Sequence, residues 1–290
     1  MAIERKLPAE VADAIAAMGP AFDPEVLKLS VALFDPIADK SLPPGGQCAR
    51  NVSYGPHERQ AVDIYSPGRS NAPVVVFIPG GGFVRGDKTS YEAVGAALAR
   101  LGVVGVVANY RLAPDFLWPS GAEDVAAIVD FVAGGIAAYG GQPDQIVMIG
   151  QSAGASHVAA AMFDERMRPQ GLEAVRHIAL MSGLYFLHPG DMSPGALSYF
   201  GADAILHADR APCRTVGGSE ATVTLTISEF DPLVYVRQGA QLAVALAEAR
   251  KRAPEFSTVL QHNHISSILN IATPYDSVSR RLLGPAAARR

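Results

Sequence analysis

Ser152 stands in the pattern Gly150-Gln151-Ser152-Ala153-Gly154, in which a serine can act as a nucleophile toward a carbonyl carbon. The apolar run 146–149 precedes it and an alanine-rich stretch follows, so we expect a strand, a sharp turn and a helix. The flanking glycines permit a strained turn and a close approach of strand and helix. The serine would then lie beside a helix N-terminus, whose dipole favours developing negative charge. A glycine-rich turn with an incidental serine is the alternative interpretation.

Three consecutive glycines, Gly80 to Gly82, follow the apolar run 74–78 and Pro79. Because glycine has no Cβ, successive backbone N–H groups can turn toward one point. In an acyl-transfer site these donors would hold the oxyanion of a tetrahedral intermediate. A flexible loop or a phosphate-binding loop is the alternative, but the segment has neither a G-K-[ST] ending nor GxGxxG spacing. Together with Ser152, the glycines indicate an oxyanion hole.

A nucleophilic serine requires a histidine base and an acid that orients it. When the serine lies in a strand–turn–helix, the acid follows it in the chain and the histidine comes last. Asp231 comes after the apolar run 223–227 and is held by Pro232. We prefer it to Glu229, although an Asp-Pro pair also opens helices.

Of the seven histidines, only His262 and His264 follow this acid. They come after the last predicted strand, 257–260, which places them at the carboxyl edge of the sheet. We expect His264 to be the base, and His262 remains the alternative. The other histidines precede the acid: His57, His157, His177, His188 and His207.

Short β-branched runs alternate with helical stretches along most of the chain, which predicts an α/β fold with a mostly parallel central sheet flanked by helices. Strands are expected near 62–64, 74–78, 103–107, 146–149, 178–181, 223–227 and 257–260. Helices are expected at 90–100, 123–138, 153–167 and 238–251. Apolar periodicity also predicts helix from 9 to 40, with Asp23-Pro24 as an N-terminal cap.

The composition excludes several classes of function. The chain has 290 residues and a net charge of −4 without a basic stripe, so we expect no nucleic-acid partner. Apolar runs stop well before the roughly 18 residues of a membrane span. Cys48 and Cys213 show no metal-ligand or CxxC spacing. The first eight residues do not read as a signal peptide, so a cytoplasmic location is expected. Only 18% of residues are charged, which makes a homodimer plausible.

Four segments resemble the hormone-sensitive-lipase branch of the α/β-hydrolase carboxylesterases. The first, 79–83, is similar to the HGGG oxyanion motif of that family. The second, 109–115 with 119 and 123–125, is similar to its YRLAPE stretch and the following "EDV". The third is the GQSAG elbow, and the fourth is 229–233. The resemblance implies a triad of Ser152, Asp231 and His264. It also implies an oxyanion hole made by the N–H groups of Gly81, Gly82 and Ala153. Residues 1–45 would form a helical cap segment and 46–290 the catalytic domain. The resemblance does not extend to 185–218, a stretch rich in Gly, Pro and Asp that is a candidate cap insertion or a long loop.

Two positions depart from that family. Pro79 replaces a histidine that braces the oxyanion loop, and its fixed φ could substitute for that bracing. Gln151 stands where the family often has an acid. The His262-Asn263-His264 loop also resembles smaller esterase and formamidase-like hydrolases.

The expected reaction is two-step acyl transfer to water on a small, rather apolar ester, with no metal or organic cofactor. An amide, carbamate or formamide hydrolase and an acyltransferase would use the same triad. A non-catalytic binding protein of this fold is the alternative from another class. The aromatic residues that we expect to line the substrate pocket are Phe83, Trp118, Tyr185 and Phe186, with Phe116 as a further candidate.

Overall fold

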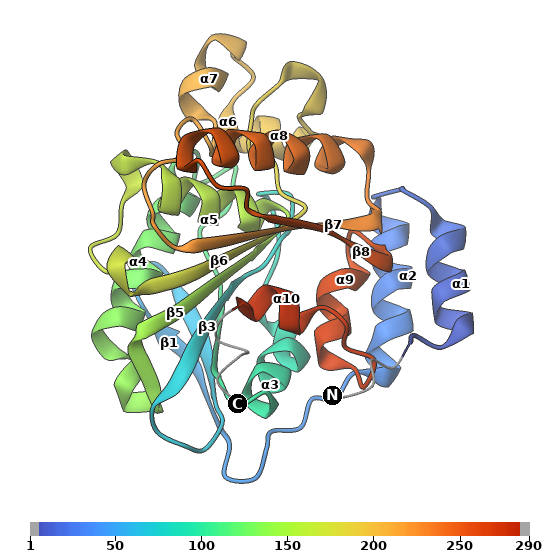
Figure 1. The fold of residues 1–290 in the computed structure, drawn as a ribbon, viewed down its shortest axis with the longest axis vertical. Coiled ribbons are helices and arrows are strands. Elements are labelled where there is room, and N and C mark those ends of the chain that lie inside the picture. Colours follow the sequence, from blue (N-terminus) through green and yellow to red (C-terminus); the bar gives the residue numbers. More distant parts are fainter. Residues whose placement is uncertain (1–5, 285–290) are drawn as a thin grey trace.

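The computed structural model describes residues 6–284, built around one twisted eight-stranded sheet (Figure 1). The first five residues, on which the signal-peptide expectation partly depends, lie outside the described residues. The strand order is β1-β2-β4-β3-β5-β6-β7-β8, antiparallel for β1, β2 and β4 and parallel elsewhere. The strands are β1 Gln47–Ser53, β2 Ala61–Ser66, β3 Ala72–Ile78, β4 Val104–Ala108, β5 Gly141–Gln151, β6 Val175–Met181, β7 Thr222–Phe230 and β8 Glu255–Asn263. The predicted α/β class is confirmed.

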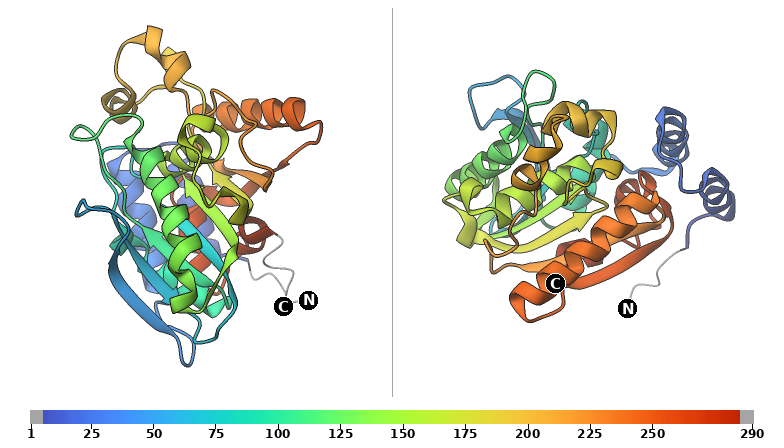
Figure 2. Two further views of the ribbon diagram at one scale, coloured as in Figure 1. Left: turned by 90° about the vertical axis from the view of Figure 1, so that its left-hand side faces the viewer. Right: turned by 90° about the horizontal axis from the view of Figure 1, so that it is seen from above.

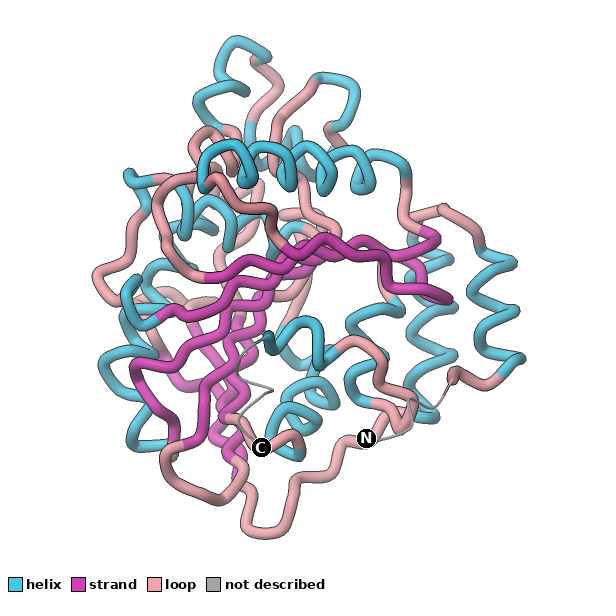
Figure 3. Tube along the Cα trace, viewed as in Figure 1, coloured by secondary structure: helices cyan, strands magenta, loops and turns pink. Residues whose placement is uncertain are grey.

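Helices cover both faces of this sheet (Figure 3). The core on one face includes side chains of α4, α5 and α8, and the core on the other includes α3, α9 and α10. The helices are α1 Ala9–Met18, α2 Pro24–Phe34, α3 Glu92–Arg100, α4 Ser120–Gly135, α5 Ala153–Phe163, α6 Pro194–Phe200, α7 His207–Arg210, α8 Leu233–Arg250, α9 Ser266–Leu269 and α10 Ser279–Leu283.

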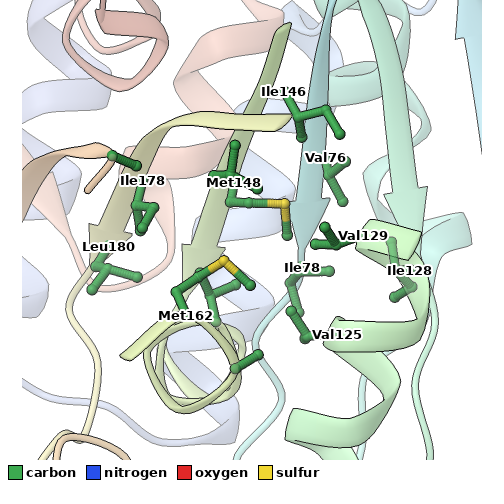
Figure 4. Close-up of a cluster of buried hydrophobic side chains, with 14 of the residues drawn as sticks. Val76, Ile78, Val125, Ile128, Val129, Ile146, Met148, Met162, Ile178 and Leu180 are labelled. Carbon is green, nitrogen blue, oxygen red and sulfur yellow. The ribbon is translucent and has the colours of Figure 1, made fainter. Parts of the chain in front are cut away.

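β3 and β4 carry no polar side chain, because both of their faces are covered. Val76 and Ile78 point toward α4 and α5, where Met148 and Met162 meet them (Figure 4). Val75 and Phe77 of the same strand pack into the opposite core with α3. This arrangement explains why the sequence shows continuous apolar runs instead of alternation.

The carboxyl ends of the parallel strands meet at one edge of the sheet. Ile78 pairs with Gly150, so the glycine loop after β3 and the turn after β5 begin at the same level. β7 ends just before Asp231, and β8 ends just before His264. In an open parallel sheet, ligands bind at this edge.

The N-terminal helices lie beside the end of β8 (Figure 1; Figure 2, right). As expected, the Asp23 carboxylate accepts hydrogen bonds from the N–H groups of Glu25 and Val26 and caps α2. Asn263 Nδ2 donates to Ser30 Oγ at 2.9 Å. The N-terminal helix α2 is therefore tied to the end of the last strand.

Several boundaries differ from the expected ones. α8 begins at Leu233, five residues before the predicted start at 238, and β8 continues to Asn263, so that His262 belongs to the strand. The weakly patterned stretch 185–218 contains α6 and α7 with short 3-10 turns, and it rises beyond α5 at the top of Figure 1. Within residues 6–284, no helix combines the length and apolarity needed to cross a bilayer.

Candidate active site

Ser152 occupies a strained turn between β5 and α5. Its φ and ψ are 54° and −122°, a conformation that non-glycine residues rarely adopt. The glycines around it make room for the turn. A Cβ on Gly150 would lie 2.6 Å from the Cα of Ala155, and a Cβ on Gly154 would collide with the Ile78 carbonyl. The pattern Gly-x-Ser-x-Gly is therefore required by the close packing of α5 against β5 and β3.

Three side chains from separate elements form one hydrogen-bonded chain. Ser152 Oγ lies 2.9 Å from His264 Nε2, and His264 Nδ1 lies 2.7 Å from Asp231 Oδ1. All three residues are buried, with His264 completely enclosed. With Nδ1 protonated toward Asp231, Nε2 is free to accept the serine proton. The arrangement is thus suited to nucleophilic attack by Ser152.

Further hydrogen bonds fix the acid and the base. Asp231 Oδ2 accepts from the Ser182 hydroxyl and from the Ser228 N–H, each at 2.6 Å. Gln151 Nε2 donates to the backbone carbonyl of His264 at 3.0 Å. Gln151, which departs from the family pattern, therefore ties the elbow to the histidine loop. Ser182 carried no recognisable signal in the sequence.

His262 and Glu229, the alternatives to His264 and Asp231, form hydrogen bonds away from Ser152. His262 Nδ1 lies 3.0 Å from Ser266 Oγ, and burial lowers the pKa of His262 to about 4. Glu229 is exposed, and its carboxylate accepts the Gln261 N–H at 2.7 Å. Neither side chain contacts Ser152, so the geometry favours His264 and Asp231 for the two roles.

Two aromatic rings contact the imidazole of His264. Tyr235, from the first turn of α8, stacks on it with a centroid distance of 4.2 Å and 25° between planes. Phe22, from the turn before α2, lies 4.4 Å away and is tilted by 54°. Burial raises the pKa of Tyr235 to about 12, and the nearby Ser152 hydroxyl acts to lower it. Sequence reasoning missed both residues.

The glycine loop lies against the serine turn. Gly81 and Gly82 have φ values of 147° and 60°. Among the described residues, no acceptor is found for the N–H groups of Gly81, Gly82 or Ala153. A Cβ on Gly80 would lie 2.9 Å from Ser152 Cβ, which shows how closely the loop approaches the nucleophile. These N–H groups are therefore available to bind an oxyanion.

The loop is braced although Pro79 replaces the family histidine. The Tyr110 hydroxyl donates to the Pro79 carbonyl at 2.9 Å. Arg59 donates to the carbonyls of Tyr110 and Gly86 at 2.8 and 2.7 Å. The Tyr-Arg-Leu-Ala-Pro segment thus supports the oxyanion loop through its tyrosine.

The arginine of the same segment is fixed by a buried acid. Arg111 Nη2 lies 2.8 Å from Asp124 Oδ1, and the Arg111 N–H donates to Oδ2 at 2.7 Å. Gln60 Nε2 donates to the same carboxylate at 2.7 Å. The "EDV" acid therefore holds the loop that carries Tyr110.

A cavity of about 490 Å³ opens beside Ser152 and His264. The apolar part of its wall comes from α2, the β4–α4 loop and the region of α9. The other residues that line it are Phe22, Leu27, Val31, Arg59, Gly80, Gly81, Arg85, Gly86, Asp87, Ser90, Tyr91, Leu112, Gln151, Ile265 and Leu269.

The aromatic residues expected to line this cavity lie elsewhere, which corrects the sequence-based expectation. Phe83 stacks on Tyr199 at 5.2 Å, in a cluster with Trp118. Tyr185 is fully buried in the core, and Phe186 packs against that core. The physical reason is that Phe83 and Trp118 pack against rings of α6 and Tyr185 lies in the main core, whereas α2 supplies the apolar wall of the cavity.

A family model described as BD-FAE matches residues 62–173. Isoprenylcysteine alpha-carbonyl methylesterase of Arabidopsis thaliana is 30% identical over 142 residues, covering 48% of this chain and 33% of that protein. Esterase LipQ of Mycobacterium tuberculosis is 37% identical over 117 residues, covering 38% of this chain and 27% of the relative. The chain thus spans about a third of the length of these curated relatives.

The solved structure of a hyperthermophilic esterase from Pyrobaculum calidifontis is similar over nearly the whole chain. Its TM-score is 0.71 at 20% identity, with 98% of this chain and 97% of that chain covered. This likeness shows the fold. Together with the sequence matches, it shows that the chain has the α/β-hydrolase fold and is similar to carboxylic ester hydrolases.

Proposed function

We propose that this chain is a serine carboxylesterase that hydrolyses small, rather apolar carboxylic esters through an acyl-enzyme on Ser152. The observation that carries the proposal is the buried hydrogen-bonded chain from Ser152 Oγ through His264 to Asp231. Its position beside three unpaired N–H groups supports the same reaction.

In the first step, Ser152 Oγ attacks the carbonyl carbon of the ester and its proton passes to His264 Nε2. Asp231 stabilises the imidazolium. The N–H groups of Gly81, Gly82 and Ala153 stabilise the oxyanion, and each such donor is typically worth about 3 kcal/mol. The carbon–oxygen bond then breaks, and His264 donates its proton to the leaving alcohol.

In the second step, a water molecule gives its proton to His264 and attacks the acyl-enzyme. The second tetrahedral intermediate uses the same oxyanion hole. Its collapse releases the acid and returns the proton to Ser152 Oγ. The cavity of about 490 Å³, with apolar side chains from α2 and α9, supports a small substrate.

Labelling with a fluorophosphonate probe tests the nucleophile. Wild-type protein should be labelled and Ser152→Ala should not. Hydrolysis of 4-nitrophenyl butyrate should fall by about 10³-fold or more in His264→Ala and in Asp231→Asn. The matched variants His262→Ala and Glu229→Gln should keep most of the activity. Folded wild-type protein that neither labels nor hydrolyses any ester would contradict the proposal.

A panel of nitrophenyl esters against the matching nitroanilides separates an esterase from an amidase with the same triad. Addition of a short alcohol tests acyl transfer, which would appear as a new ester product. We expect hydrolysis of the esters to dominate. Faster turnover of the anilides would assign the site to amide chemistry.

A cytoplasmic location, a homodimer, and the division into a cap segment (1–45) and a catalytic domain (46–290, with 185–218 as cap insertion) are further proposals. The low share of charged residues supports self-association. Light scattering on the purified chain measures the dimer directly.

A further inference from the structure

Three charged side chains line the cavity beside Ser152: Arg59, Arg85 and Asp87. Arg59 is already engaged, because it donates to two backbone carbonyls and its Nη1 lies 3.7 Å from Asp87 Oδ2. Its charge is therefore balanced within the wall of the cavity.

Asp87 is also engaged. Its carboxylate accepts hydrogen bonds from the Thr89 N–H at 2.9 Å and from Asn109 Nδ2 at 2.8 Å. Burial acts to raise the pKa of Asp87, but the bonds from Thr89 and Asn109 outweigh it and hold the pKa below its ordinary value. Asp87 is thus an anion that is matched by Arg59.

Lys88, the next residue along the chain, does not contribute charge to the cavity. Its Nζ lies 2.8 Å from Asp63 Oδ1 and donates to Asn51 Oδ1, and its side chain is buried. The positive charge of Lys88 is therefore neutralised away from the cavity wall.

Arg85 is different. Within residues 6–284, its guanidinium has no hydrogen-bond or ion-pair partner. The residue is held close to the reacting centre, because its N–H donates to the Gly81 carbonyl at 3.1 Å. A Cβ on Gly81 would collide with the Arg85 carbonyl. Arg85 thus extends from the oxyanion loop itself and leaves one uncompensated positive charge in the cavity wall.

We propose that this cavity takes esters that carry a carboxylate, and that Arg85 is the specificity-determining residue that recognises it. A guanidinium binds a carboxylate through two parallel hydrogen bonds. Leu27, Val31 and Leu269 offer an apolar surface within the same cavity. The preferred substrate is then an ester with an apolar portion and a carboxylate several bonds from the scissile carbonyl. This inference rests on the proposed function.

The test compares matched anionic and neutral esters. Mono-4-nitrophenyl adipate is compared with 4-nitrophenyl hexanoate, which places the carboxylate on the acyl side. 4-Carboxyphenyl butyrate is compared with phenyl butyrate, which places it on the alcohol side. The measured quantity is the ratio of kcat/KM for the anionic ester to that for the neutral ester, in wild type, Arg85→Gln, Arg85→Lys and Arg85→Glu.

For at least one pair, Arg85→Gln should lower this ratio about tenfold, mainly through KM, because the lost contact is made equally in the ground state and the transition state. Arg85→Lys should keep part of the selectivity, and Arg85→Glu should lower the ratio further. The selectivity of the wild type should also fall as salt is added.

Arg168→Gln is the matched control, because Arg168 pairs with Glu173 at the surface and does not line the cavity. It should leave both ratios unchanged. Equal ratios in wild type and Arg85→Gln for both pairs would overturn the inference while leaving the esterase proposal intact. Failure of the wild type on all four esters would instead contradict the proposed function.

Discussion

The ring of Phe22 lies 4.4 Å from the imidazole of His264, although 241 residues of chain separate the two positions. Phe22 belongs to the turn between α1 and α2, whereas His264 follows the last strand. This contact, together with the stacked ring of Tyr235, encloses the base in aromatic carbon. The N-terminal segment therefore forms part of the wall around the proposed base.

Phe22→Leu should lower kcat for a neutral ester by about fivefold, since an aromatic contact is worth about 1 kcal/mol beyond its buried area. The positively charged imidazole formed during attack also gains from an aromatic neighbour. Steady-state kinetics measure the effect. Phe22→Tyr keeps the ring and should retain activity. Equal kcat in Phe22→Leu and wild type would show that the contact does not assist the base.

Tyr110→Phe should lower kcat several-fold with little change in KM, because the Pro79 carbonyl loses its hydrogen bond and the oxyanion loop loses a brace. Tyr54→Phe is a matched control: the Tyr54 hydroxyl donates to the Asn109 carbonyl at 2.8 Å and does not contact the oxyanion loop. Each variant should lose about 1 kcal/mol of stability. A kcat loss of the same size in both would assign the effect to general destabilisation.

Asp124→Asn should reduce the free energy of unfolding by about 3 kcal/mol, because it removes the buried counter-charge of Arg111. Denaturation in urea gives this value. Glu123→Gln removes the other acidic partner of Arg111, at 3.1 Å, but that carboxylate is half exposed. Its loss should cost less than about 0.5 kcal/mol. Similar losses in the two variants would mean that burial does not decide the strength of these pairs.

His157 should make the fold sensitive to acid. Among residues 6–284, neither ring nitrogen has a hydrogen-bond partner, and Phe83, Tyr110 and Tyr199 surround the ring. Burial lowers the pKa of His157 from its ordinary value of 6.5 to about 3. Below pH 6.5 the unfolded chain therefore binds a proton at His157 that the folded chain does not bind. The free energy of unfolding decreases as the pH falls toward 3.

The variant His157→Leu removes this proton linkage. Between pH 6 and pH 4, its free energy of unfolding should decline less steeply than that of the wild type, by up to about 1.4 kcal/mol per pH unit. His177 and His262 are also buried with lowered pKa values of about 4, so the difference between the two proteins is the relevant quantity. Parallel stability curves would show that His157 takes up a proton in the folded state.

The central sheet could be predicted because its strands are buried on both faces and so carry unbroken β-branched runs, as in β3 and β5. The strand–turn–helix position of Ser152 could be predicted because the strand, the turn and the helix are adjacent in the chain. The choice of Asp231 and His264 as partners of Ser152 could be made from the order serine, acid, histidine along the chain and from their positions after strand ends. Each of these inferences depends on local sequence or on a simple topological rule.

The remaining features depend on how distant segments pack. Phe22 stands in a turn without any motif, and it reaches His264 only because α1 packs beside β8 and α2 beside α9. Tyr235 was missed because α8 was expected to begin three residues after it. The aromatic residues expected in the pocket were chosen by type alone, and side-chain type does not reveal which element closes a cavity.

The bond between Asn263 and Ser30 joins positions 233 residues apart. Closing so long a loop costs conformational entropy before the contact can stabilise the fold. Such contacts therefore form late and slowly during folding. The serine turn and the glycine loop come from the neighbouring strands β5 and β3, whereas His264 also depends on its contact with Phe22 of the N-terminal segment. During refolding, hydrolysis should therefore return after the sheet has formed. Recovery of ester hydrolysis would then report the packing of the N-terminal helices against the last strand.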